Sequence, residues 1–200
     1  MDNSSFNIVT NTLKCLSYEP PSFLIDVGAS EGQYTSNSFY LLKDKLWSGL
    51  LIEPMLKQFK ELQELYIDRP DIQCINAALT DNDGFCDIHL HPNDGDGSCT
   101  CNHGSSLIKP DRSNVSFVVP SISFKTISQQ LPAEVGMLSI DTEGYDKFII
   151  NGLLSYGIRP HIIITEIFNL EHLDDKSKLL ESYGYNMVVN TNHDTGWILS

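Results

Sequence analysis

Basic residues are scarce in this 200-residue chain, which has 13 lysines and arginines against 26 aspartates and glutamates and a formal net charge of −13. A nucleic-acid backbone and an anionic membrane surface would both repel such a chain. We therefore expect no nucleic acid and no membrane as a partner, whereas a small neutral or cationic ligand fits the charge.

Long apolar runs are absent as well. The most apolar stretch, Ile162–Ile164, is far shorter than the roughly 20 residues that a membrane-spanning helix needs. No pattern typical of a secretory signal peptide precedes Lys14, the first basic residue. The five cysteines are odd in number and irregular in spacing, which does not suit a disulfide framework. We expect reduced thiols and a cytoplasmic location.

The residues that are present are those of a folded protein, with 41% hydrophobic and 20% charged side chains. A chain of this length usually forms one domain with a sizeable core. We expect an N-terminal helical extension over residues 1–22 and a single domain over residues 23–200.

Strand-like and helix-like segments alternate along that domain. Strands are expected at Phe23–Val27, Gly49–Ile52, Ile72–Leu79, Phe85–Leu90, Val115–Ser123, Met137–Asp141, Pro160–Phe168, Tyr185–Asn190 and Gly196–Leu199. Helices are expected at Gln33–Leu46, Met55–Tyr66, 126–131, 145–156 and Glu171–Tyr183. This alternation predicts an α/β fold, with a parallel sheet, helices on both faces and a final antiparallel hairpin. In such a sheet, ligands bind beyond the carboxyl ends of the strands.

The loop after the first strand, Asp26–Gly32, carries the strongest functional signal. Its glycines allow close approach and unusual torsions, and the following helix offers free N–H groups. The G-x-G-x-x-G pattern of dinucleotide sites is incomplete, and Asp26 and Glu31 would repel a pyrophosphate. These acids suit a ligand with an amino group and a sulfonium. The alternative is a tight turn that binds no ligand.

Two further strand ends add to this pattern. Glu53 ends the second strand, about 20 residues after the glycine loop, where a carboxylate commonly binds ribose hydroxyls. It could instead only cap the helix that follows. Asn76 offers a donor and an acceptor for a purine, and the small Ala77 leaves room for a flat ring.

Carboxylates at the later strand ends are the candidates for chemistry. Asp141 and Glu143 are two residues apart, so in an extended segment they would point the same way, and Glu166 ends the next strand. The pair could share one proton, bind a divalent cation or face a sulfonium. The simpler alternative is that Glu143 caps the next helix.

The long loop His91–Pro110 holds a second group of polar side chains. Imidazole and thiol groups gather in and beside it, at His89, His91, Cys99, Cys101 and His103. Such ligands can bind zinc, but the C-x₂-C spacing of structural zinc sites is absent. A polar loop over the substrate pocket is the alternative, and no metal ligands are assigned. One of these histidines could also serve as a base.

The combined motifs resemble the FkbM family of S-adenosylmethionine (SAM)-dependent methyltransferases. The resemblance is carried by Ile25–Gly32, Leu51–Pro54, Asn76–Leu79, Leu138–Gly144 and Ile163–Ile167. It implies a Rossmann-like seven-stranded sheet with the last strand antiparallel, SAM as cofactor, and methyl transfer usually to an oxygen. A small molecule or a sugar or glycan would be the acceptor.

Site residues follow from the resemblance position by position. The methionine part of SAM would contact Asp26, Gly28, Ser30 and Gly32. Glu53 would bind the ribose, Asn76 or Ala77 would lie near the adenine, and Asp141, Glu143 or Glu166 would act in catalysis. Where the family's motif continues Gly-Ala-Glu, this chain has Gly144 followed by Tyr145 and Asp146. Two alternatives remain: an inactive SAM-binding module of the same fold, and an NAD-dependent oxidoreductase.

Overall fold

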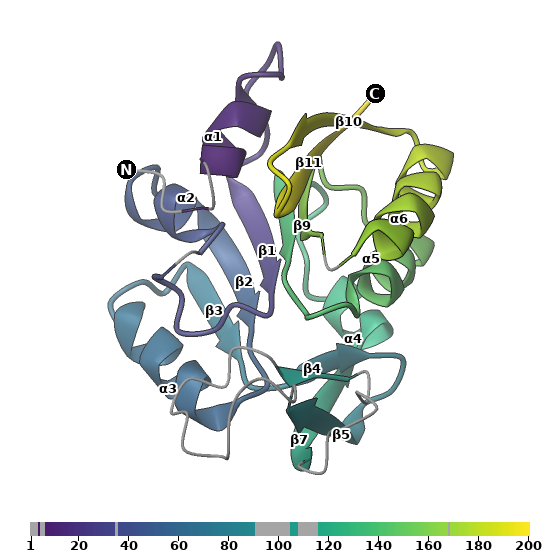
Figure 1. Ribbon diagram of the computed structural model, residues 1–200. Coiled ribbons are helices and arrows are strands. Elements are labelled where there is room, and N and C mark those ends of the chain that lie inside the picture. The colour runs from purple at the N-terminus through teal and green to yellow at the C-terminus, as the bar shows by residue number, and fades with distance from the viewer. Residues whose placement is uncertain (1–3, 5–6, 35, 91–104, 108–115, 168) are drawn as a thin grey trace.

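Seven strands form one twisted sheet in the order β10-β11-β9-β8-β1-β2-β3 in the computed structural model of the protein (Figure 1). The structure describes Ser4 and residues 7–34, 36–90, 105–107, 116–167 and 169–200. The strands of this main sheet are β1 (Phe23–Val27), β2 (Ser48–Ile52), β3 (Ile72–Ile75), β8 (Met137–Ile140), β9 (Ile162–Glu166), β10 (Tyr185–Asn190) and β11 (Asp194–Leu199). The pairs among β1, β2, β3, β8 and β9 are parallel, and β11 runs antiparallel to both β9 and β10. This confirms the predicted Rossmann-like α/β fold.

Helices cover both faces of the main sheet (Figure 1). One face carries α1 (Ile8–Leu13), α2 (Phe39–Lys43) and α3 (Leu56–Leu65), and the other carries α4 (Phe124–Ser128), α5 (Asp146–Ser155) and α6 (Leu170–Ser182). The β-branched run Ile162–Ile164 is fully buried, as expected for a strand with helices on both sides. None of the described helices has the length and hydropathy needed to cross a bilayer.

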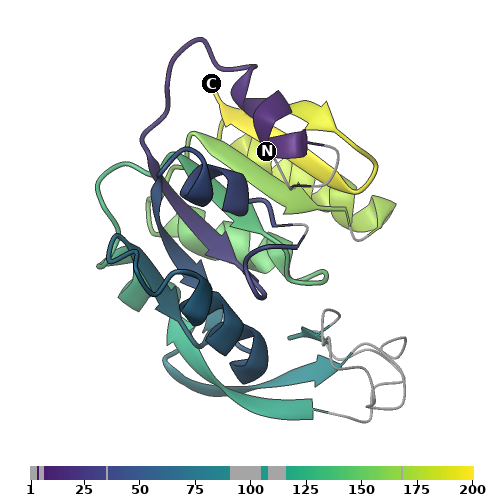
Figure 2. The ribbon, with the colours of Figure 1, turned by 90° about the vertical axis from the view of Figure 1, so that its left-hand side faces the viewer.

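A second, smaller sheet lies at the carboxyl ends of β1, β2 and β3 (Figure 2). Its strands are β4 (Ala78–Thr80), β5 (Gly84–Leu90), β6 (Ser105–Ser106) and β7 (Ser116–Ser123), in the order β4-β7-β5-β6. Met55, Ala78, Ile88 and Val119 form an apolar cluster between this sheet and the start of α3. The small sheet thus covers the edge at which ligands bind in parallel α/β folds.

The single strand predicted at Ile72–Leu79 is wrong, because the chain divides there into β3 and β4 in different sheets. Asn76 lies at the break, and its side-chain nitrogen donates to the carbonyl oxygens of Glu53 and Pro54, each at 2.9 Å. These bonds fix the end of β3 beside the end of β2, and the chain then continues into the second sheet.

The predicted helix Gln33–Leu46 is also too long. Gly32 has a φ of +80°, and the Ser36 hydroxyl accepts hydrogen bonds from the amides of Ser38 and Phe39. A side chain that caps the first free amides sets the start of the helix there, so α2 begins only at Phe39.

The region expected as an N-terminal extension contains α1, which packs closely on the main sheet. Ile8 and Val9 are buried in the cluster on that face. A Cβ atom on Gly196 of β11 would lie 2.0 Å from the Thr12 hydroxyl oxygen, so the helix approaches the strand backbone. The division of the chain at residue 22 remains a prediction.

Candidate functional site

A cavity of about 450 Å³ lies between the main sheet and the small sheet. It is lined by the loops after β1, β2 and β8 and by residues of α3, β4 and β5. Predicted site residues that line it are Asp26, Gly28, Ser30, Glu53, Ala77, Asp141 and Glu143. Three predicted residues are not among the described residues that line it, namely Gly32, Asn76 and Glu166.

The glycine loop takes its shape from the protein backbone around it. The amides of Gly28 and Ala29 both donate to the carbonyl oxygen of Ile52 on β2. Gly28 has a φ of +82°, and a Cβ atom there would lie only 1.9 Å from the carbonyl oxygen of Asp141. The end of β8 is therefore a close neighbour of Gly28, and close approach of a ligand to this glycine stays a prediction.

Gly32 has a packing role. A Cβ atom there would lie 2.4 Å from Cδ1 of Leu62, so its small size lets the loop approach α3. Contact between Gly32 and the methionine part of SAM remains a prediction.

Glu53 both caps the chain before α3 and faces the cavity. Its Oε1 accepts from the Met55 amide at 2.7 Å, and its Oε2 accepts from the Ser30 amide at 2.8 Å. The residue is only 5% exposed. Burial raises the pKa of Glu53 to about 7, although the hydrogen bonds from Met55 and Ser30 oppose this shift. The capping role that the sequence left as an alternative is thus observed, and ribose binding by Glu53 stays a prediction.

Asp26 lies beside Glu53 at the end of β1. Burial raises the pKa of Asp26 to about 6, while hydrogen bonds from Ser38 and Ser139 lower it. The charge of Asp26 also contributes to the raised pKa of Glu53. A ligand that brings positive charge into this part of the cavity would stabilise both carboxylates.

Ala77, Ala78 and Leu79 contribute apolar side chains to the lining of the cavity. Asn76 precedes them, but both of its described side-chain bonds go to the β2 end. The structure therefore places Asn76 where it positions Glu53 and Pro54. Its contact with an adenine stays a prediction.

Asp141 and Glu143 both reach the cavity, although not through the extended chain that the sequence suggested. The strand β8 ends at Ile140, and Glu143 has a φ of +53°, so the segment turns. The N-cap position of α5 is occupied by Tyr145, which makes no capping side-chain bond.

The pKa of Asp141 lies well above its ordinary value. The main cause is the loss of solvation of the carboxylate by the protein around it, followed by repulsion from the carboxylates of Glu166, Asp146 and Glu143. The side chain nevertheless stays open to the cavity. A proton is therefore held more tightly at Asp141 than on an ordinary aspartate.

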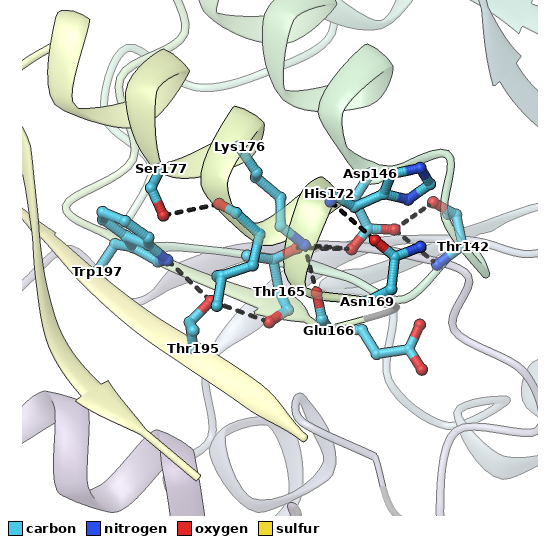
Figure 3. A network of polar contacts seen from close by, with 11 residues as sticks. Thr142, Asp146, Thr165, Glu166, Asn169, His172, Lys176, Ser177, Thr195 and Trp197 are labelled. Atoms are coloured by element: carbon cyan, nitrogen blue, oxygen red, sulfur yellow. Dashed lines mark hydrogen bonds and ion pairs between the residues drawn. The ribbon is translucent and has the colours of Figure 1, made fainter. Parts of the chain in front are cut away.

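A buried ion pair fixes the turn that carries these acids (Figure 3). Asp146 Oδ1 accepts from the Thr142 amide at 3.2 Å and from the Thr142 hydroxyl at 2.7 Å. Asp146 Oδ2 accepts from the Thr165 hydroxyl at 2.6 Å and from Lys176 Nζ at 3.3 Å. Asp146, where the family has glutamate, thus connects the turn after β8 with β9 and α6.

Lys176 completes the same network. Its Nζ donates to the Thr165 hydroxyl at 2.9 Å and to the carbonyl oxygen of Glu166. The side chains of Lys176 and Asp146 are 3% and 4% exposed, so both charges are buried. No sequence pattern indicates this pair, because its members are 30 residues apart on different helices.

The Glu166 carboxylate points away from this network (Figure 3). Its Oε2 is buried and has no hydrogen-bond partner within the described part of the chain. Burial raises the pKa of Glu166 to about 7, and repulsion from Glu143, Asp146 and Asp194 adds to the shift, while Lys176 opposes it. Glu166 thus adds negative charge behind Asp141.

Two amides that line the cavity were not predicted. Asn37 precedes α2 and Gln58 lies in α3, and both are buried. For Gln58 a signal existed, because it lies three residues after Met55 and four before Leu62, on the apolar stripe of the helix. For Asn37 the sequence offers no such pattern.

The possible zinc ligands lie mostly outside the described residues. Of that group only His89 is described, on β5, whereas His91, Cys99, Cys101 and His103 are not. Within the described ranges, no group of three or more His, Cys, Asp or Glu side chains could hold a metal ion.

Comparison with known proteins identifies what this arrangement is similar to. The model of the methyltransferase FkbM domain matches residues 26–187. No curated protein sequence is a significant match. The fold is similar to that of the FkbM methyltransferase from Methylobacillus flagellatus KT, with a TM-score of 0.58 and 15% identity. That match covers 92% of this chain but only 45% of the other, so this chain spans less than half of it.

Other solved structures share the fold at similarly low identity. The fibrillarin pre-rRNA processing protein of Methanococcus jannaschii has a TM-score of 0.55 and 14% identity, covering 100% of this chain and 76% of that one. The methyltransferase PaMTH1 of Podospora anserina, solved with S-adenosylhomocysteine (SAH), has a TM-score of 0.54 and 11% identity. That match covers 96% of this chain and 76% of the other. At such identities, the similarity shows the fold alone.

Proposed function

The chain belongs to the FkbM methyltransferase family, and from this premise we propose that it methylates a hydroxyl group of a small molecule or glycan. The family uses SAM as its cofactor, which supplies a methyl group already activated by a positively charged sulfur. The protein's contribution is then to bind this donor, to hold an acceptor oxygen in line with the methyl carbon, and to receive the hydroxyl proton.

The residues of the cavity fit such a donor. Its described lining carries the carboxylates of Asp26, Glu53, Asp141 and Glu143, and no lysine, arginine or histidine. This set favours a ligand that bears an ammonium and a sulfonium. Ala77 and Ala78 in the lining are small apolar residues that leave room for a purine ring.

Each part of the lining has a proposed role. Asp26, Gly28 and Ser30 bind the methionine part, as the family resemblance implies, and Gly32 supports that loop. Glu53 binds the ribose hydroxyls, because each of its oxygens still has a lone pair besides the one used by a backbone amide. Ala77 lies near the adenine. Asn76 positions the adenine indirectly, because its side chain fixes the end of β2.

Asp141 is the proposed base, and its position is the observation that carries the proposal. It follows β8, its backbone carbonyl lies beside Gly28, and the residue is exposed and lines the cavity. A raised pKa makes this carboxylate a stronger acceptor for a hydroxyl proton. Glu143 faces the same cavity, and Glu166 assists through its negative charge.

The test is an acceptor screen that measures SAH release from SAM. Simple sugars, glycans and small alcohols are compared with amines of matching skeleton. We expect release with at least one hydroxyl compound and not with its amine counterpart. Release only with amines would contradict transfer to oxygen, and SAM binding without release from any acceptor would favour the inactive binding module.

A further inference from the structure

We propose that Asn37 and Gln58 bind the two ends of SAM, Asn37 the methionine end and Gln58 the nucleoside end. The inference rests on the proposed use of the cavity as the SAM site. It adds two neutral amides to a site for which the sequence motifs give mainly acids, glycines and a serine.

Both side chains are buried, and each has an oxygen that is unpaired among the described residues. Asn37 is 7% and Gln58 is 6% exposed, and both line the cavity. Asn37 Oδ1 and Gln58 Oε1 are buried and, within the described part of the chain, have no hydrogen-bond partner. Native proteins rarely leave buried polar groups unpaired, because an unpaired group has lost its water without replacement. A ligand in the cavity is the partner that both amides lack.

Asn37 lies on the methionine side of the cavity. Its neighbour Ser38 hydrogen-bonds the carboxylate of Asp26, which ends β1 before the glycine loop. The Ser36 hydroxyl accepts from the amides of Ser38 and Phe39, so the backbone on both sides of Asn37 is held in place. Asn37 is therefore held next in the chain to a residue that bonds the acid that we assign to the methionine part.

Gln58 lies on the nucleoside side. It is in the first turn of α3, just after the segment in which Glu53 Oε1 accepts from the Met55 amide. A leucine or methionine would suit this buried position between Met55 and Leu62 better if packing alone mattered. The polar side chain instead belongs to the lining of the same cavity as Glu53, Pro54 and Ala77, to which we assign the ribose and adenine.

The chemistry of a primary amide suits both ends. The atoms left unpaired by the described residues are the two amide oxygens, and an amide oxygen can accept from an ammonium at one end of SAM or from a ribose hydroxyl at the other. It also forms these bonds without adding to the negative charge of Asp26, Glu53, Asp141 and Glu143.

The experiment compares two ligands by isothermal titration calorimetry. SAH contains both ends, whereas 5′-methylthioadenosine has the same nucleoside and sulfur but lacks the amino-acid end. Asn37→Leu should weaken SAH binding about 10-fold or more and leave 5′-methylthioadenosine binding within 2-fold. Gln58→Met should weaken both ligands by a similar factor, about 10-fold.

Two exposed positions supply matched controls. Gln63→Met on α3 and Asn151→Leu on α5 make the same chemical changes at exposed positions, and should change neither affinity. Melting temperatures without ligand show whether each variant is folded. If Asn37→Leu or Gln58→Met fails to fold, Asn37→Ser and Gln58→Asn, which shorten the reach of the side chain, should give the same pattern.

The outcomes separate this inference from the function on which it rests. Wild-type affinity for SAH in both variants, with SAH bound by the wild type, would overturn the assignment of Asn37 and Gln58 and leave the SAM site standing. An equal loss of affinity for both ligands in Asn37→Leu would overturn the assignment of Asn37 to the methionine end of SAM. No binding of SAH or SAM by the wild type would overturn the proposed function together with this inference.

Discussion

Gly28 shows how one residue connects the fold with the site. Its φ of +82° suits glycine, and a Cβ atom would lie 1.9 Å from the carbonyl oxygen of Asp141. The position of the proposed base therefore depends on the absence of a side chain on the neighbouring strand. The family resemblance marked Gly28, but only the structure shows which atom approaches it.

Gly28→Ala should lower both stability and SAM affinity, because Asp141 must move. Gly157 is the matched control, since its φ is +81° and nothing lies within 4 Å of its Cβ position. Gly157→Ala should cost only the backbone strain, about 1–2 kcal/mol. Urea denaturation and calorimetry measure the two effects. If Gly28→Ala and Gly157→Ala lose the same stability and both keep the wild-type SAM affinity, the close contact between Gly28 and Asp141 is contradicted.

Sequence motifs located much of the site at this scale. Asp26 lies near the end of β1, and Gly28, Glu53 and Asp141 follow strands, whose carboxyl ends meet at one edge of a parallel sheet. Side chains that reach the cavity from helices or irregular segments, such as Asn37, have no such positional rule. Their role depends on tertiary packing, which local spacing does not contain.

At the scale of elements, α5 and α6 are joined to the turn after β8 by the buried pair of Asp146 and Lys176. A buried pair contributes little net stability compared with apolar side chains, but removing one partner leaves the other charge buried and unpaired. We infer that the pair serves to hold the turn that carries Asp141 and Glu143.

Lys176→Met should therefore destabilise the protein by about 3–5 kcal/mol. It should also lower kcat for methyl transfer, because the turn loses its anchor. The exposed pair of Lys178 and Asp174 is the control, and Lys178→Met should change stability far less than Lys176→Met does. Asp146→Asn combined with Lys176→Met should recover part of the loss. Similar urea midpoints for the two single variants would refute the buried ion pair.

Periodicity predicted the elements of the main sheet well, because β1, β2, β8 and β9 are short apolar runs buried on both sides. It failed where a side chain ended an element. The Asn76 amide divides a continuous apolar stretch into two strands, and the Ser36 hydroxyl delays the start of α2. Both events depend on specific hydrogen bonds, which a hydrophobic pattern does not reveal.

At the scale of the whole molecule, the net charge is −13, and the described lining of the cavity is acidic as well. The pKa of Asp26 is raised to about 6, and those of Glu53 and Glu166 to about 7. Each group binds its proton more tightly in the folded than in the unfolded state. The stability that these protons confer on the folded state is lost as the pH rises from the pKa values of the unfolded chain toward those of the folded protein.

The ligand-free protein should accordingly be less stable at pH 8 than at pH 5.5. Burial of ionised carboxylates is the physical cause, and bound SAM should reduce the difference by placing positive charge beside them. Chemical denaturation at several pH values, with and without SAM, measures this. Constant or increasing stability between pH 5.5 and 8 would show that these carboxylates do not control it.

The central claim is that Asp141 takes the proton of an acceptor hydroxyl in a SAM-dependent methyl transfer. Its most direct test is the rate of SAH release at saturating SAM, measured against pH for the wild type and Asp141→Asn with a hydroxyl acceptor. We predict a wild-type rate that rises with pH as Asp141 ionises, and a rate about 10²-fold lower in Asp141→Asn, with SAM affinity little changed. A near-normal rate with the same pH profile in Asp141→Asn would contradict the claim.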